Sequence, residues 1–248
     1  MKKLLVMLCA IFLVFGIVGG AHALLIVRGV GTISGVSGQY QLVYDTDQEI
    51  TWLDYNRPGR QKNWYDQTAW ADGLVVDFEG QKLDGWRLPA VDESAMTAIG
   101  EGWWGPDEDG YYDYSTGWNM TNSEMGYLSY ITLENIGYVA LDGTFPQDGW
   151  YDPQGLVNTG PFNEFLNAPD RTDWYWSSTD IGSDPDSAYI FYFYRGQQGS
   201  DRKCCALASA VAVMDGDVAA PVPEPATMLL LGSGLLVLAG LKRKFRKK

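Results

Sequence analysis

The chain has 248 residues, of which 31 are Asp or Glu, 18 are Lys or Arg and one is His. The net charge of −13 at pH 7 excludes nucleic acid and anionic lipid as partners of the whole surface, because both would be repelled. The single imidazole, His22, lies in a segment predicted to be removed, which argues against Ser-His or Cys-His catalysis and a His-based zinc site.

The first 23 residues have the three parts of a secretory signal peptide. Met1–Lys3 is a charged start, residues 4–18 are apolar, and Ala21-His22-Ala23 is a small-x-small cleavage site. Cys9 lies inside the apolar part and follows Leu8, where a lipoprotein signal needs a small residue. The sequence therefore predicts an exported protein without a lipid anchor, and its mature part lacks histidine.

Residues 24–220 are expected to form one exported domain, since about 200 residues suffice for a sizeable core. Two of the 18 basic residues lie in the signal peptide and six in the last seven residues, so ten remain against 31 acids. The exported part therefore carries a net charge of about −21. Neutral glycans or divalent cations suit such a surface better than polyanions.

Short strands and helices are expected along this domain. Residues 24–54 alternate weakly between apolar and polar and are interrupted by Asp45-Thr46-Asp47, which predicts short strands. Residues 63–71 are expected to form a helix that Asn63 caps. A second short helix is expected after Pro89, and a further helix or ordered segment near residues 124–133. Three β-type runs follow, at residues 175–179, 188–194 and 206–213.

An aromatic and acidic segment spans residues 103–118. Its rings offer flat faces for the C–H surface of a sugar, and its carboxylates offer acceptors for hydroxyl groups. The alternative is a loop that packs its own aromatic side chains onto the core. The candidate glycan-binding residues are Trp103, Trp104, Tyr111, Tyr112, Tyr114 and Trp118.

Acidic side chains in two loops offer the hard oxygen ligands that calcium prefers. The first set is Asp107, Asp109 and Asp113, and the second is Asp180, Asp184 and Asp186. Neither has the Asp-x-Asp-x-Asp-Gly pattern closed by a Glu at the twelfth position, so solvated acidic loops are the simpler interpretation. Calcium is therefore the one cofactor kept as an alternative.

Cys204 and Cys205 are adjacent and are the cysteines that remain after signal removal. Disulfides persist in an exported protein. The pair can stay reduced as two small apolar residues, close a vicinal disulfide in an eight-membered ring, or bond to another chain. Their spacing excludes a CxxC redox motif.

The C-terminal region combines three elements in a fixed order. Pro223-Glu224-Pro225 precedes 16 uncharged residues, 226–241, and six of the last seven residues are Lys or Arg. As a helix the uncharged segment would span roughly 24 Å, slightly short for a hydrocarbon core of about 30 Å, so the flanking basic side chains would snorkel. The positive-inside rule then places residues 242–248 in the cytoplasm and the domain outside.

This order of elements resembles the PEP-CTERM sorting signal, with Pro223, Glu224 and Pro225 as the sorting motif in residues 221–248. The resemblance implies processing by an exosortase, a membrane protease of bacteria that make exopolysaccharide. It predicts a protein held in the inner membrane by the transmembrane helix 226–241 before processing. The expected destination is the cell surface or extracellular matrix of a Gram-negative bacterium.

A second resemblance covers most of residues 40–216. Ile50-Thr51-Trp52-Leu53, then Gly85-Trp86-Arg87-Leu88-Pro89, then Tyr175-Trp176-Ser177-Ser178-Thr179 follow the order seen in the C-terminal domain of the Legionella collagen-like adhesin. The resemblance implies a compact α+β, C-type-lectin-like domain with two or more short helices, short antiparallel strands and long loops. Its signature residues would be Trp52, Trp86, Arg87, Leu88, Pro89, Glu93, Trp176, Ser177 and Ser178.

These signature residues have structural roles in the simplest interpretation. Arg87 is expected to orient a carboxylate such as Glu93 or Asp84. Ser177 and Ser178 have no identifiable general base, so their hydroxyls would be weak nucleophiles and are expected to serve turns. A glycosidase needs two carboxylates at a set separation, which 31 acids supply by chance. We therefore expect no catalytic residue.

The sequence thus predicts an exported, non-enzymatic surface or matrix module that binds exopolysaccharide and no nucleic acid. A purely structural or self-associating surface protein is the first alternative. A carbohydrate-active enzyme is the second.

Overall fold

The computed structural model describes residues 24–55, 61–95, 116–142, 144–145, 156–166, 174–182 and 184–218. The predicted signal peptide, residues 103–115 of the aromatic segment and the predicted transmembrane helix 226–241 lie outside the described residues. None of the helices among the described residues has the length and apolar composition needed to cross a membrane.

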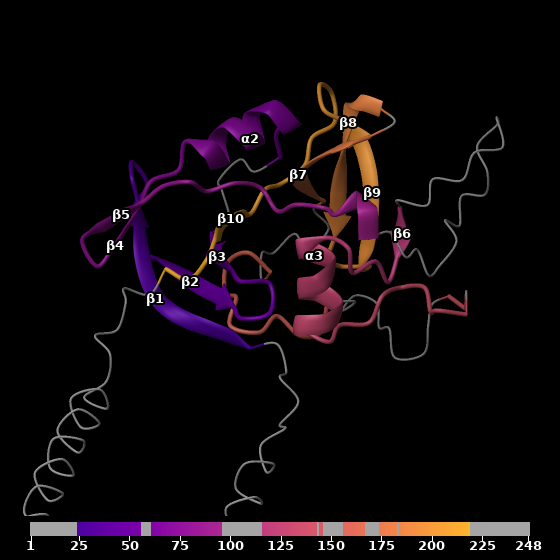
Figure 1. Cartoon of the computed structure of the whole chain (residues 1–248), viewed down its shortest axis with the longest axis horizontal. Coiled ribbons are helices and arrows are strands. Elements are labelled where there is room, and N and C mark those ends of the chain that lie inside the picture. Colours follow the sequence, from indigo (N-terminus) through magenta and orange to yellow (C-terminus); the bar gives the residue numbers. More distant parts are fainter. Residues whose placement is uncertain are drawn as a thin grey trace, which may run out of the picture.

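Two antiparallel sheets form the frame of the domain, and Figure 1 shows them side by side with a helix above. The six-stranded sheet has the order β10-β3-β2-β1-β4-β5, and the four-stranded sheet has the order β6-β9-β8-β7. The strands of the first are β1 (Leu25–Ile33), β2 (Tyr40–Asp45), β3 (Ile50–Asp54), β4 (Val76–Phe78), β5 (Gln81–Leu83) and β10 (Ala212–Asp215). Those of the second are β6 (Gly117–Trp118), β7 (Tyr175–Ile181), β8 (Asp184–Tyr192) and β9 (Gln197–Arg202).

Short helices connect the strands, in agreement with the predicted α+β class. Helix α2 (Trp64–Asp72) begins where the Asn63 side chain accepts a hydrogen bond from the amide of Asp66, so the predicted helix and its cap are confirmed. The segment predicted at 124–133 is an α-helical turn, α3 (Glu124–Tyr127), that continues as the π-helical η2 (Leu128–Thr132). At the second short helix expected after Pro89, the structure describes the 3₁₀ turn η1 (Glu93–Ala95), and residues 96–99 lie outside the described residues.

The segment 206–215 connects the two sheets, which corrects the expectation of a single strand at residues 206–213. The amide of Ser209 donates to the carbonyl of Trp174 at 2.8 Å, and the amide of Trp176 donates back to Ser209 at 3.0 Å. Three residues after Ser209 the chain enters the six-stranded sheet as β10, which pairs with β3. The apolar run is therefore divided between two sheets, and only residues 212–215 form a regular strand.

Aromatic side chains fill the space between the sheets. Trp52 of β3 stacks on Phe165 with ring centres 6.0 Å apart, and Phe165 also contacts Tyr175 and Phe193 edge to face. A second cluster contains Leu42 of β2, Leu53 of β3 and Val76 of β4, together with Trp86. The signature residues Trp52, Trp86, Leu88 and Trp176 are all fully buried.

Candidate functional site

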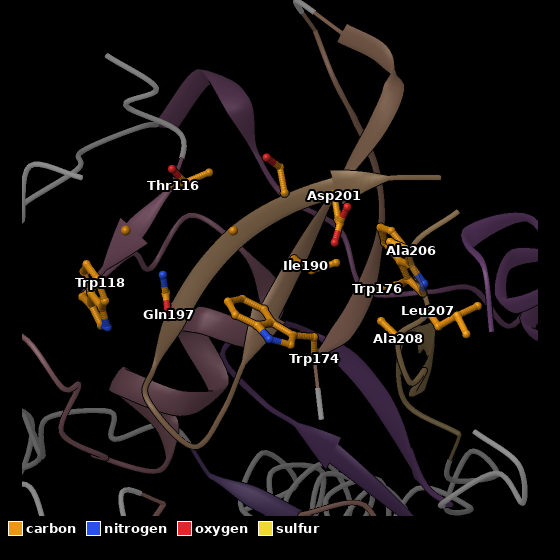
Figure 2. A pocket seen from close by; sticks show the side chains of 13 residues that line it. Thr116, Trp118, Trp174, Trp176, Ile190, Gln197, Asp201, Ala206, Leu207 and Ala208 are labelled. Atoms are coloured by element: carbon orange, nitrogen blue, oxygen red, sulfur yellow. The ribbon is translucent and has the colours of Figure 1, made fainter. Parts of the chain in front are cut away.

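A cavity of about 370 Å³ lies against one face of the four-stranded sheet (Figure 2). Strands β6, β8 and β9 contribute to its lining, together with Trp174 and Trp176 at the start of β7. The segment 206–208 closes one side. The cavity is thus built from segments that lie far apart in the sequence and that the sheet brings together.

Strand alternation determines which residues reach this cavity. Tyr175, Phe191 and Phe193 belong to the aromatic core shared with Trp52. The opposite face carries Trp176 and Ile190, which are paired in register, and Ile190 is paired with Gly199 on the next strand. That face is covered in part by α2 and the segment 206–210, and the cavity lies beside this cover.

Trp174 is the half-buried aromatic ring of the cavity (Figure 2). It stacks on Tyr192 with ring centres 5.0 Å apart and an angle of 28° between the planes. A Cβ atom at Gly199 would lie 3.1 Å from the Trp174 ring, so the absence of a side chain there lets the ring reach over β9. The neighbouring strands therefore hold the Trp174 ring in a fixed place before any ligand arrives.

Two further tryptophans complete the aromatic lining. Trp176 is fully buried, and its indole N–H donates to the carbonyl of Lys62 at 3.0 Å. Trp118 lies in β6, paired with Gln197, and is only 5% exposed. Its indole N–H has no acceptor among the described residues, and a buried donor without a partner costs roughly 1–3 kcal/mol. The cavity lining therefore includes a residue with unused hydrogen-bonding capacity.

Polar groups lie beside the aromatic ones. Thr116, Gln197 and Ser200 line the cavity together with Asp201, the one charged residue among the described lining residues. Asp201 is exposed, and one of its carboxylate oxygens accepts the amide N–H of Arg202 at 2.7 Å. The arrangement of a preformed aromatic surface with a few polar groups is typical of small-ligand sites, including sugar sites.

One of the predicted glycan-binding residues, Trp118, belongs to this cavity. It lies almost buried in a short strand, whereas we expected a loop. Trp103, Trp104, Tyr111, Tyr112 and Tyr114 lie outside the described residues. The sequence reasoning missed Trp174 and Asp201. The signal for Trp174 was present, because residues 174 and 176 have the spacing that places two side chains on the same face of a strand.

Of the acidic residues considered for calcium, the structure describes Asp180, Asp184 and Asp186. Asp107, Asp109 and Asp113 lie outside the described residues. Asp180 pairs with the Lys203 ammonium at 2.6 Å. Asp184 accepts hydrogen bonds from the Ser187 hydroxyl and the Asp186 amide, which lower the pKa of Asp184. Within the described part of the chain, no three His, Cys, Asp or Glu residues are grouped so as to hold a metal ion.

Arg87 binds carboxylates other than those expected. Its guanidinium donates to both carboxylate oxygens of Glu124, at 2.8 and 2.7 Å, and to Asp215 at 2.6 Å. The hydrogen bond to Glu124 raises the pKa of Arg87. Glu93 instead accepts hydrogen bonds from the Tyr189 hydroxyl and the Gly182 amide, both at 2.9 Å. Arg87 therefore connects α3 to β10, whereas Glu93 of η1 is bound to Tyr189 and Gly182.

The serines of the signature make local hydrogen bonds. The Ser177 hydroxyl accepts the amide N–H of Thr179 at 3.0 Å. The amide of Ser178 donates to the carbonyl of Pro89 at 2.8 Å, and its hydroxyl reaches the same oxygen at 3.4 Å. These bonds attach β7 to the Trp-Arg-Leu-Pro segment.

Cys204 and Cys205 form a vicinal disulfide, so the structure selects one of the three alternatives. Both residues are exposed, in the turn between β9 and the segment 206–208. The preceding Lys203 is buried, donates to the carbonyl of Pro185 at 2.6 Å and lies 4.6 Å from the centre of the Trp64 ring. The turn beside the cavity is thus held by a covalent ring and by a buried cation.

Comparison with known proteins identifies the C-terminal region. Residues 221–244 match the PEP-CTERM protein-sorting motif. No curated protein and no solved structure matches the chain. The match confirms the predicted sorting signal, which implies export, a C-terminal membrane-anchored signal and processing by an exosortase. The resemblance to the adhesin domain stays a prediction.

Proposed function

We propose that this exosortase-sorted protein is a non-enzymatic surface or matrix module that binds extracellular polysaccharide in the cavity of the four-stranded sheet. The observation that carries the proposal is the Trp174 ring, fixed by Tyr192 and Gly199 beside the polar groups of Gln197 and Asp201. The sorting motif supports it, because the resemblance to PEP-CTERM implies processing by an exosortase, a protease of bacteria that make exopolysaccharide.

The two sides of the cavity match the two surfaces of a sugar ring. The C–H face of a sugar packs on an aromatic ring, while its hydroxyl groups exchange hydrogen bonds with amide and carboxylate side chains. Gln197 is paired with Trp118 and Tyr192 in the sheet, so its side chain lies on the aromatic face. A volume of about 370 Å³ is at the lower end of the range for ligand sites, which suits a short stretch of glycan.

Replacing Trp174 with alanine is expected to weaken polysaccharide binding by about tenfold or more, because a fixed aromatic surface is lost. The measurement is retention of the full chain, in detergent, on immobilised exopolysaccharide from the producing bacterium. Tyr65→Ala is the matched control, since Tyr65 is an exposed aromatic residue that does not line the cavity. Equal retention of Trp174→Ala and the unmodified chain would contradict the proposal.

Alanine in place of Pro223, Glu224 and Pro225 is expected to stop processing of the tail. We expect the full-length chain to accumulate in the membrane fraction, while the unmodified chain is recovered in shortened form at the surface or in the matrix. Fractionation followed by mass determination measures both outcomes. A shortened, released product of the variant would show that another route removes the tail.

A self-associating structural protein is the second candidate. Val27 and Val30 of β1 are apolar and each more than 40% exposed, and they pair with Val43 and Gln41 on the same face of β2. Exposed apolar side chains that lie together mark contact surfaces between proteins. This function predicts concentration-dependent association of the chain without polysaccharide, together with no retention on the immobilised glycan.

We also propose that the domain is C-type-lectin-like, as the adhesin resemblance implies. The two antiparallel sheets and the helices α2 and α3 support this assignment, as does the attachment of Ser178 to Pro89. It adds no activity, because a fold hosts many functions.

A further inference from the structure

We infer that the cavity takes a hexosamine whose amino group is free and positively charged, and that Asp201 determines this specificity. The inference rests on the proposed glycan-binding function and names the class of sugar.

The position of Asp201 is fixed by the sheet. It lies on β9 opposite Ala188 of β8, two residues beyond Gly199, so its side chain is on the same face as Ile190 and Trp176. Figure 2 shows its carboxylate pointing toward Ile190, on the side of the cavity away from Trp118. A ligand that rests on the aromatic residues therefore has a carboxylate within the same space.

The nearby cations are directed elsewhere. Lys203 is buried and bound to Asp180, to the carbonyl of Pro185 and to the face of Trp64. Arg202 lines a different cavity, with Tyr65, Asp184 and Asp186. Among the described residues, no cation is paired with Asp201. A ligand ammonium group would therefore meet no competing cation of the described residues at Asp201.

Aromatic rings and a carboxylate favour the same kind of ligand group. The face of an indole attracts a cation through its quadrupole, and an ammonium–carboxylate hydrogen bond is stronger than a neutral one. A uronic acid would instead face the charge of Asp201 and the net charge of −13 of the chain. An N-acetylated amine is neutral and gains neither attraction.

The test uses one sugar backbone in two states. Glucosamine oligomers and the same oligomers after full N-acetylation are titrated against the full chain in detergent. We expect the free-amine form to bind at least about tenfold more tightly, and Asp201→Asn to remove this difference by weakening binding of the free-amine form. Asp186→Asn is the matched control, because it makes the same change in net charge at an exposed residue of the other cavity. It should keep the preference.

Different results overturn different statements. If the unmodified chain binds both oligomers equally and Trp174→Ala binds neither, the role of Asp201 is refuted. The proposed polysaccharide function then stands. A preference that persists in Asp201→Asn, or disappears equally in Asp186→Asn, also refutes it, since the cause would then be the charge of the whole surface. Poly-lysine that displaces the glucosamine oligomer at equal amine concentration would show a general cation site. Binding of neither oligomer, nor of the native exopolysaccharide, removes both the inference and the proposed function.

Discussion

Replacement of Asp54 by alanine is expected to lower the free energy of unfolding by about 4 kcal/mol, because it leaves one buried and two partly buried backbone donors without their acceptor. Asp54 ends β3 and is 1% exposed. Its carboxylate accepts three successive amide N–H groups, those of Asn163 at 2.8 Å, Glu164 at 3.0 Å and Phe165 at 2.8 Å. Chemical denaturation of residues 24–220 measures the effect.

The Asp54→Ala substitution is also expected to disturb the packing of the aromatic core. Phe165 follows directly in this turn and stacks on Trp52, so a displaced turn disturbs the contact between the two sheets. Asp54→Asn is the control, because one side-chain oxygen remains to accept the amides of Glu164 and Phe165. We expect it to cost about half as much. A cost below about 1 kcal/mol for Asp54→Ala would mean that the amides find other acceptors.

Arg87→Ala is the second change with a large expected effect, about 3 kcal/mol of destabilisation. The guanidinium binds Glu124 through two parallel hydrogen bonds, and the Glu124 side chain is only 19% exposed. Removal of the arginine leaves a largely buried carboxylate without its counter-charge. Glu124 also accepts the amide N–H of Ala90 at 2.7 Å. Without Arg87, the start of α3 would therefore lose its link to β10 but keep its hydrogen bond to Ala90.

Two variants test this explanation of Arg87 by thermal and chemical denaturation. Arg87→Lys keeps the charge but not the paired hydrogen bonds, so its stability should lie between those of the unmodified chain and Arg87→Ala. Asp215→Asn should cost at most about 1 kcal/mol, because the Asp215 side chain is 80% exposed. If Asp215→Asn were as costly as Arg87→Ala, the surface partner and not Glu124 would be the important one.

The local patterns of the sequence predicted the elements that depend on neighbouring residues. The turn at Asp45 and the cap at Asn63 both follow from short-range hydrogen bonds: the Asp45 carboxylate accepts the amides of Asp47 and Gln48, and Asn63 accepts that of Asp66. The sorting signal was equally readable, because its function depends on residue order alone.

Features that depend on distant residues were not predicted. Glu124 and Asp215 are 37 and 128 residues from Arg87, so no local pattern distinguishes them from Glu93 or Asp84. The cavity depends on the register of β8 and β9, which places Gly199 opposite Ile190 and Asp201 opposite Ala188. The strand at Trp118 was also not predicted, because its neighbours in the sequence are aromatic residues and glycines typical of a loop. It belongs to a strand because it pairs with Gln197, 79 residues away.

The segment 206–215 has a consequence for the order of folding. β3 lies near the start of the domain and pairs with β2, and β7 lies in its second half and pairs with β8. The other edge of each strand gains its hydrogen-bonding partner from this late segment. Asp217 then forms an ion pair with Arg28 of β1, which joins the last described residues to the first strand. Pairings between distant residues form slowly, and unpaired strand edges aggregate. Because these contacts come directly before the sorting motif at residues 221–244, both sheets gain their last pairings only once the chain up to the sorting region is available.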